Sequence, residues 1–165
     1  MTLMRLVDLT HVIEHQMITY PGLPGPEIGE HLGSDASACP YATGTEFAIG
    51  QISMVANTGT YIDTPAHRFR GGHDLADLSL EHCVQLPAVA VDGEGAIGSI
   101  DSVNIDDAAG GQRPAHTILL AAGIPIGEHP PGLGGLPAVG ALFTAIPPAI
   151  HALASFLVCA FATLP

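Results

Sequence analysis

The pattern of hydrophobic and polar positions changes every few residues, which is typical of a fold built from short strands and tight turns. Alternating or continuously apolar segments predict six short strands, over residues 3–9, 46–55, 88–91, 99–105, 124–126 and 155–162. The segment 46–55, EFAIGQISMV, alternates regularly enough that we expect a half-buried strand there.

Two helices are predicted between these strands. Asp74 is a suitable N-cap for a short helix over 74–84. Pro114 suits the first turn of a helix covering His116 to Ala122, and Gly123 suits its C-terminal cap. Segments rich in proline and glycine predict loops over 21–26 and 130–140. The 165 residues show no repeat or internal boundary, so we expect one α/β domain spanning 1–165.

Charge and composition narrow the functional classes. Sixteen acidic residues against four basic ones give a net charge of −12, which excludes nucleic acid and an anionic membrane surface as main partners. A hydrophobic content of 47% excludes a wholly disordered chain. The three cysteines are few and far apart, and the N-terminus has no signal-peptide pattern, so we expect a cytoplasmic protein. The apolar segment 149–165 falls short of the roughly 20 clean residues of a membrane span, and we expect core strand there.

Polar residues able to do chemistry concentrate in two segments. In the first, NTGTYIDTPAH over 57–67, Pro65 argues against a helix, so Asp63 and His67 are expected on a stiff extended or turning loop. In the second, we expect His116 to stay neutral near a helix N-terminus and Glu128 to lie just past a strand. Taken singly, Asp63 is typical of a turn or cap, and both histidines are typical of structural residues. Glu128 among apolar neighbours is costly without a partner or a metal.

The segment 57–67 resembles the H-x-G-T-H-x-D-x-P-x-H signature of the cyclase family, which includes bacterial kynurenine formamidases and isatin hydrolases. The segments 8–11, 20–22, 113–116 and 128–129 also resemble parts of that family. The resemblance implies a mixed-sheet α/β fold of the swivelling β/β/α type and a metal-dependent enzyme that opens amide or lactam bonds. It also implies that His67 is the catalytic base and that Asp63, His116 and Glu128 are metal ligands.

The chain departs from this signature at two metal-ligand histidines, which are replaced by Asn57 and Tyr61. A neutral phenol is a poor zinc ligand, so a weakly held Mn²⁺, Zn²⁺ or Mg²⁺, or no metal, is expected. Tyr61 is a candidate to donate a hydrogen bond to a substrate carbonyl, and Asn57 to bind the substrate. The family also carries a further segment where this chain has only 93–98, so we expect exposed apolar surface and a homo-oligomer, a dimer or tetramer.

Three functions stay open from the sequence. The leading one is a cyclase-family hydrolase that opens an amide or lactam bond of a small aromatic or cyclic substrate, with His67 as general base. The second is a metal-independent cyclase, dehydratase or isomerase of secondary metabolism that uses His67 and Tyr61. The third is a non-catalytic member that binds a small molecule or serves an oligomer.

Overall fold

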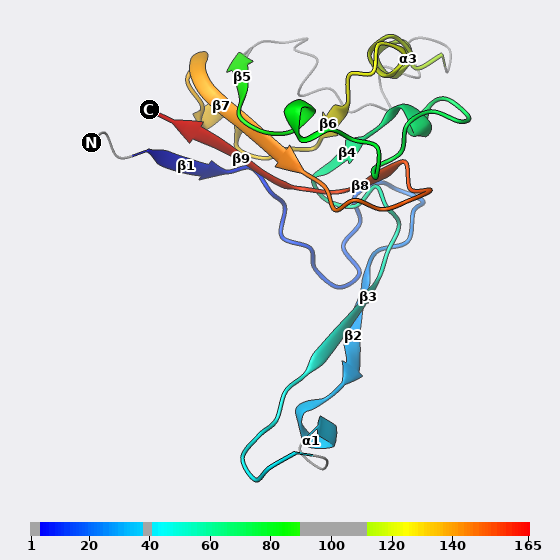
Figure 1. The fold of residues 1–165 in the computed structure, drawn as a ribbon, viewed down its shortest axis with the longest axis vertical. Coiled ribbons are helices and arrows are strands. Elements are labelled where there is room, and N and C mark those ends of the chain that lie inside the picture. The colour runs from blue at the N-terminus through cyan, green and yellow to red at the C-terminus, as the bar shows by residue number, and fades with distance from the viewer. Residues whose placement is uncertain (1–3, 38–40, 90–111) are drawn as a thin grey trace.

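The computed structural model describes residues 4–37, 41–89 and 112–165, which form a body and a projecting arm (Figure 1). The body contains a four-stranded sheet and a three-stranded sheet, and a separate two-stranded sheet forms the arm. No helix among these residues is long and apolar enough to cross a bilayer. The α/β fold class expected from the sequence is confirmed, and the strand pairs of the described residues are antiparallel.

The four-stranded sheet carries most of the hydrophobic core. Its strands lie in the order β1-β9-β7-β5, with the bounds β1 Arg5–Asp8, β9 Cys159–Leu164, β7 Val139–Ile146 and β5 Leu86–Val89. In β9, Ala160, Ala162 and Leu164 are buried at every second position, as expected for one face of a strand on a core. Leu9, Leu75 and Val158 complete the deepest part of the same cluster.

The three-stranded sheet positions the polar residues. Its central strand β4 (Tyr61–Asp63) lies between β6 (Ile126–Glu128) and β8 (Ser155–Leu157). Ile62 points into the hydrophobic core, so its neighbours Tyr61 and Asp63 point to the opposite face. Residues directly opposite each other in an antiparallel pair share a face. Glu128, opposite Tyr61, and Ser155, opposite Asp63, therefore lie on that polar face too.

Short helices surround this sheet. The helix α3 (Pro114–Ala121) begins at its proline, ends before Gly123 with φ of 74°, and buries His116 and Leu120. The body also contains three 3₁₀ turns, η1 Pro65–His67, η2 Leu80–His82 and η3 Leu133–Gly135.

The arm consists of β2 (Glu27–Leu32), the short helix α1 (Ser34–Ser37) and β3 (Ile49–Ser53), and it extends away from the body (Figure 1). Its two strands pair only with each other, and all five residues of β3 are exposed. The sequence predicted a half-buried strand over 46–55 and no strand at 27–32. The first expectation is wrong about burial, because an alternating strand buries one face only where another layer covers it.

The predicted helix over 74–84 is also wrong. Turns and η2 occupy this segment, because polar side chains satisfy the backbone locally. Asp74 accepts from the backbone N–H of Ala76 at 2.8 Å and from that of Ala152 at 2.7 Å, while Ser79 caps η2.

Other expectations hold with shifted bounds. The strands near 3–9, 88–91 and 124–126 are present as β1, β5 and β6, so Glu128 is the last residue of β6 rather than past it. The strand expected over 155–162 is divided into β8 and β9, since Val158 donates to the Thr60 carbonyl at 3.0 Å where the chain passes between sheets. The loop expected over 130–140 contains η3 and the first residues of β7. The strand 99–105 and the shortened segment 93–98 lie outside the described residues.

Candidate active site

The turn before β4 directs the chain into the polar face. Gly59 has φ of 64°, and a Cβ there would lie 2.5 Å from Cδ1 of Ile13. Only glycine fits this combination of left-handed backbone and close approach. Asp63 then ends β4, and Pro65 begins the 3₁₀ turn that contains His67. The loop expected here is wrong in detail, because strand pairing on both sides fixes Asp63, and proline is tolerated at the first position of a helical turn.

Asp63 is completely buried, and its two oxygens have different surroundings. Oδ1 accepts a short hydrogen bond from the Ser155 hydroxyl and a longer one, at 3.4 Å, from the Asn57 amide. Oδ2 makes no hydrogen bond to any of the described residues. It lies 3.6 Å from Nε2 of His116. One oxygen is thus fixed by donors while the other is directed toward the second chemical segment.

His67 lies beside Asp63 with its ring orientation fixed. Its Nδ1 is 3.0 Å from the Ser155 hydroxyl and 3.4 Å from Oδ1 of Asp63. Because that hydroxyl donates to Asp63, it accepts from Nδ1–H of His67, which leaves a lone pair on Nε2. Burial lowers the pKa of His67, and Arg113 and His116 lower it further against the opposing effect of Asp63. His67 is therefore a neutral imidazole at neutral pH.

His116 extends from α3 toward two carboxylates. Its Nε2 lies 3.1 Å from Oε1 of Glu128 and 3.6 Å from Oδ2 of Asp63. The nearby carboxylates of Asp63 and Glu128 raise the pKa of His116 to about 9, against the effect of burial. The expectation of a neutral His116 is therefore wrong for this arrangement, because two carboxylates outweigh the helix N-terminus.

Arg113 lies between the two imidazoles. Its Nη1 is 2.9 Å from Nε2 of His67, and its Nη2 is 2.9 Å from Nε2 of His116. It occupies the N-cap position of α3 with φ of 47° and ψ of 60°, a left-handed conformation that is uncommon for a residue other than glycine.

A second group of polar side chains, linked by hydrogen bonds, begins at Tyr61. Its hydroxyl lies 2.5 Å from that of Tyr20, which in turn lies 2.6 Å from Nε2 of His129. Burial and the Tyr20 hydrogen bond raise the pKa of Tyr61 far above its ordinary value. Tyr61 thus stays protonated and is a hydrogen-bond donor rather than a phenolate ligand.

The arrangement suits a divalent cation. One ligand atom each from Asp63, His67 and His116 lie within 4.8 Å of one another, and Oε1 of Glu128 lies 3.1 Å from Nε2 of His116. A buried carboxylate oxygen without a hydrogen bond is costly unless a cation approaches it, and Oδ2 of Asp63 is such an atom. Imidazole and carboxylate donors are ligands used by Zn²⁺ and Mn²⁺.

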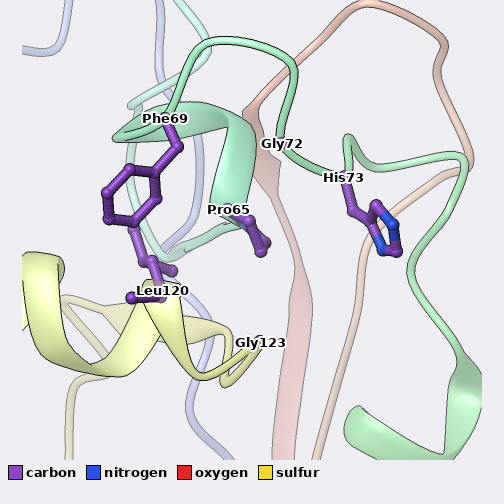
Figure 2. Close-up of a pocket in the computed structure, with 7 residues that line it drawn as sticks. Pro65, Phe69, Gly72, His73, Leu120 and Gly123 are labelled. Carbon is purple, nitrogen blue, oxygen red and sulfur yellow. The ribbon is translucent and has the colours of Figure 1, made fainter.

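An open cavity of about 410 Å³ lies between the segment after β4 and α3 (Figure 2). Apolar side chains dominate its lining, including Pro65, Phe69 and Leu120, with His73 at one side. Gly72 also lines it, and a Cβ there would lie 2.7 Å from the Pro65 carbonyl carbon. None of the site residues named above lines this cavity, although Pro65 and Leu120 belong to the two elements that carry His67 and His116.

The structure brings Asp63, His67, His116 and Glu128 together and places Asn57 against Asp63. Sequence reasoning missed four further polar residues that contact these or Tyr61, namely Ser155, Arg113, Tyr20 and His129. Arg113 carried a signal, since it is one of only four basic residues and adjoins the predicted helix. Ser155 is an ordinary strand residue in sequence, and only its pairing opposite Asp63 reveals its contact.

Residues 7–123 match the model of the family described as "Putative cyclase". No curated protein sequence matches the chain. The matched range includes Asp63, His67, Arg113 and His116 and ends before Glu128.

Solved structures share the fold at low sequence identity. Isatin hydrolase A from Ralstonia solanacearum has a TM-score of 0.71 and 15% identity, covering 98% of this chain and 92% of that one. Isatin hydrolase A from Labrenzia aggregata bound to benzyl benzoate gives 0.72 and 17%, covering 98% and 94%. A structure from Bacillus stearothermophilus described as a predicted metal-dependent hydrolase gives 0.69 and 18%, covering 98% and 99%.

Proposed function

Because this chain belongs to the cyclase family, we propose that it is a hydrolase that opens an amide or lactam bond of a small aromatic or cyclic substrate. The observation that carries the proposal is the convergence of Asp63, His67, His116 and Glu128 in one cluster. The solved structures described as isatin hydrolases support the hydrolytic class, and kynurenine formamidase-like substrates fit the same chemistry.

His67 serves as the general base in this proposal. Its Nδ1–H is held by Ser155, so Nε2 is the nitrogen that takes a proton from water. The lowered pKa keeps His67 in its base form at neutral pH. The activated water then attacks the carbonyl carbon, and the amide nitrogen leaves after receiving a proton from the imidazolium.

Asp63, His116 and Glu128 would hold the divalent ion, with Mn²⁺, Zn²⁺ and Mg²⁺ as the candidates. Such an ion, when bound, polarises a carbonyl and lowers the pKa of water. Ser155 and Asn57 fix Oδ1 of Asp63, which leaves Oδ2 directed toward the position between the two segments. These two side chains act as positioning residues.

Tyr61 is assigned to the substrate side of the site. It shares the polar face of β4 with Asp63, and its raised pKa preserves the proton it would donate to a substrate oxygen. Such a donation requires the hydroxyl to exchange its contact with Tyr20 for one with the substrate.

Hydrolysis of a panel that includes isatin and N-formyl aromatic amides tests the proposal. We expect turnover that EDTA abolishes and Mn²⁺ or Zn²⁺ restores, and we expect His67→Ala to remove turnover without changing substrate affinity. Unchanged turnover in His67→Ala would contradict the assignment of the base.

A metal-independent lyase or isomerase is the second candidate. Its supporting observation is the protonated Tyr61 at the end of the Tyr20 and His129 chain, which could stabilise a substrate oxyanion in place of a metal. Turnover on hydroxy or keto acids that is indifferent to EDTA and sensitive to Tyr61→Phe would favour it.

We also assign the protein to the cytoplasm and to a homo-oligomer that acts on a small molecule. Cys83 and Cys159 are free thiols, as expected in a reducing compartment. The exposed apolar side chains of the arm, including Ile28, Ile49 and Ile52, support a second copy of the chain as partner.

A further inference from the structure

Arg113 contacts the two ring nitrogens that the proposed chemistry needs. A guanidinium carries only donors, so Nε2 of His67, which lies 2.9 Å from Nη1, must present its lone pair to Arg113. On His67 that lone pair belongs to the proposed base. On His116, the Nε2 that lies 2.9 Å from Nη2 is the atom that would bind the ion after losing its proton.

The guanidinium and a divalent ion exclude each other at this position. A metal ion binds an imidazole nitrogen at roughly 2.0–2.1 Å along the lone pair. The two guanidinium nitrogens each lie 2.9 Å from the Nε2 atom of one imidazole, and Oδ2 of Asp63 is only 3.6 Å from Nε2 of His116, so an ion bound to these atoms would need the space that the guanidinium fills. One cation must leave before the other can bind.

The backbone of Arg113 indicates that this placement is fixed by the fold. A left-handed conformation at a residue with a side chain is strained and persists where its surroundings hold it. Pro114 begins α3 directly afterwards and restricts the chain. Arg68, by contrast, donates to the Thr117 hydroxyl, and Arg70 is exposed.

We propose that Arg113 is an intramolecular competitor of the divalent ion, whose guanidinium bridges His67 and His116 and must be displaced for metal to bind. The inference rests on the proposed metal-dependent function and adds to it a residue that sets metal affinity. The structure then represents the closed state, in which both the base and the metal ligand are capped. The competition would weaken metal binding for a reason that is independent of the replaced histidines.

Calorimetric titration of Mn²⁺ into the full-length, EDTA-stripped protein tests this inference. Arg113→Gln removes the cation, so we expect Mn²⁺ to bind on the order of tenfold or more tightly than to the unchanged protein. Arg70→Gln is the matched control and should leave the affinity unchanged. A larger Mn²⁺-induced rise in melting temperature for Arg113→Gln is the second readout.

Arg113→Lys is a second variant, which keeps the inference testable if Arg113→Gln does not fold. A single ammonium is a compact point charge and cannot reproduce the guanidinium bridge between two imidazoles, so we expect a smaller gain in Mn²⁺ affinity.

Equal or weaker binding of Mn²⁺ to both variants would overturn the inference. If Asp63→Asn still weakened binding in that case, the metal-dependent function would stand without it. Absence of Mn²⁺ binding to every variant would overturn the inference together with the metal site. Loss of an EDTA-insensitive turnover in Arg113→Gln would assign Arg113 a catalytic role and exclude that of competitor.

Discussion

The three-stranded sheet of the body buries polar side chains, whereas the two-stranded sheet of the arm exposes apolar side chains. In the body, β4 buries Asp63 and Tyr61 almost completely. In the arm, β2 and β3 expose Ile28 and Ile52, which are paired across the strands and are 43% and 49% exposed. Both arrangements cost free energy in an isolated chain.

The compensation differs between the two regions. Buried polar groups in the body are stabilised within the chain, by hydrogen bonds from Ser155 and Asn57 and by the imidazole of His116. The arm has no covering layer among the described residues, so none of these residues shields its apolar side chains from water. The region that we propose for chemistry therefore differs from the one that we propose for association in where its partners come from.

The largest expected effect is on turnover. His67→Ala removes the base on the polar side of the body, and kcat should fall by about 10²–10⁴-fold with little change in KM. His31→Ala, on an exposed strand of the arm, is the control and should change neither constant. A comparable loss in both variants would break the distinction between the two regions.

Metal affinity should respond next. Asp63→Asn replaces the buried carboxylate by a neutral amide, so the Kd for Mn²⁺ should rise by on the order of 100-fold, measured by calorimetry. Asp35→Asn in α1 removes an exposed carboxylate of the arm and should leave Kd unchanged. Tight binding that survives Asp63→Asn would remove Asp63 from the ligand set.

Association should depend on the arm instead. Ile28→Ser together with Ile52→Ser removes apolar surface that we expect a second copy to cover, and the dimer dissociation constant should rise tenfold or more. Analytical ultracentrifugation measures this, with the exposed Val12→Ser of the body as control. If the protein without substitutions is monomeric, the proposed oligomer is contradicted. If the double variant dimerises as tightly as that protein, the interface lies elsewhere.

The smallest effect concerns stability and pH. Because the carboxylates of Asp63 and Glu128 raise the pKa of folded His116 from 6.5 to about 9, its contribution to stability is fully present below pH 6.5. It is lost as pH rises through about 9, so the free energy of unfolding of EDTA-stripped protein should fall over that window. His116→Gln should flatten this dependence in denaturant titrations, whereas His31→Gln should not. An identical pH profile in all three proteins would contradict the raised pKa.

Local rules were sufficient for several elements. Pro114 and Gly123 placed α3 correctly, because caps and first-turn prolines act within a few residues. The segment 57–67 led to Asp63 and His67 for the same reason, since its one glycine and one proline fix the backbone near them. The same reasoning failed at 74–84, where side chains competed with a helix for backbone hydrogen bonds.

Long-range pairing decided the rest. Ser155 and Asp63 are 92 residues apart, and their contact depends on the register of β8 against β4. The exposure of β3 depends on whether another layer covers the strand, and its alternating sequence pattern cannot predict whether such a layer is present.

The sequence by itself determined the family, the acidic balance and the residues from which an active site could be built. Tertiary structure alone decided that Arg113 lies between two imidazoles and that His116 faces two carboxylates. The physical reason is that charge interactions depend on distances of a few ångströms, and such distances between remote segments exist only after the strands and α3 have packed together.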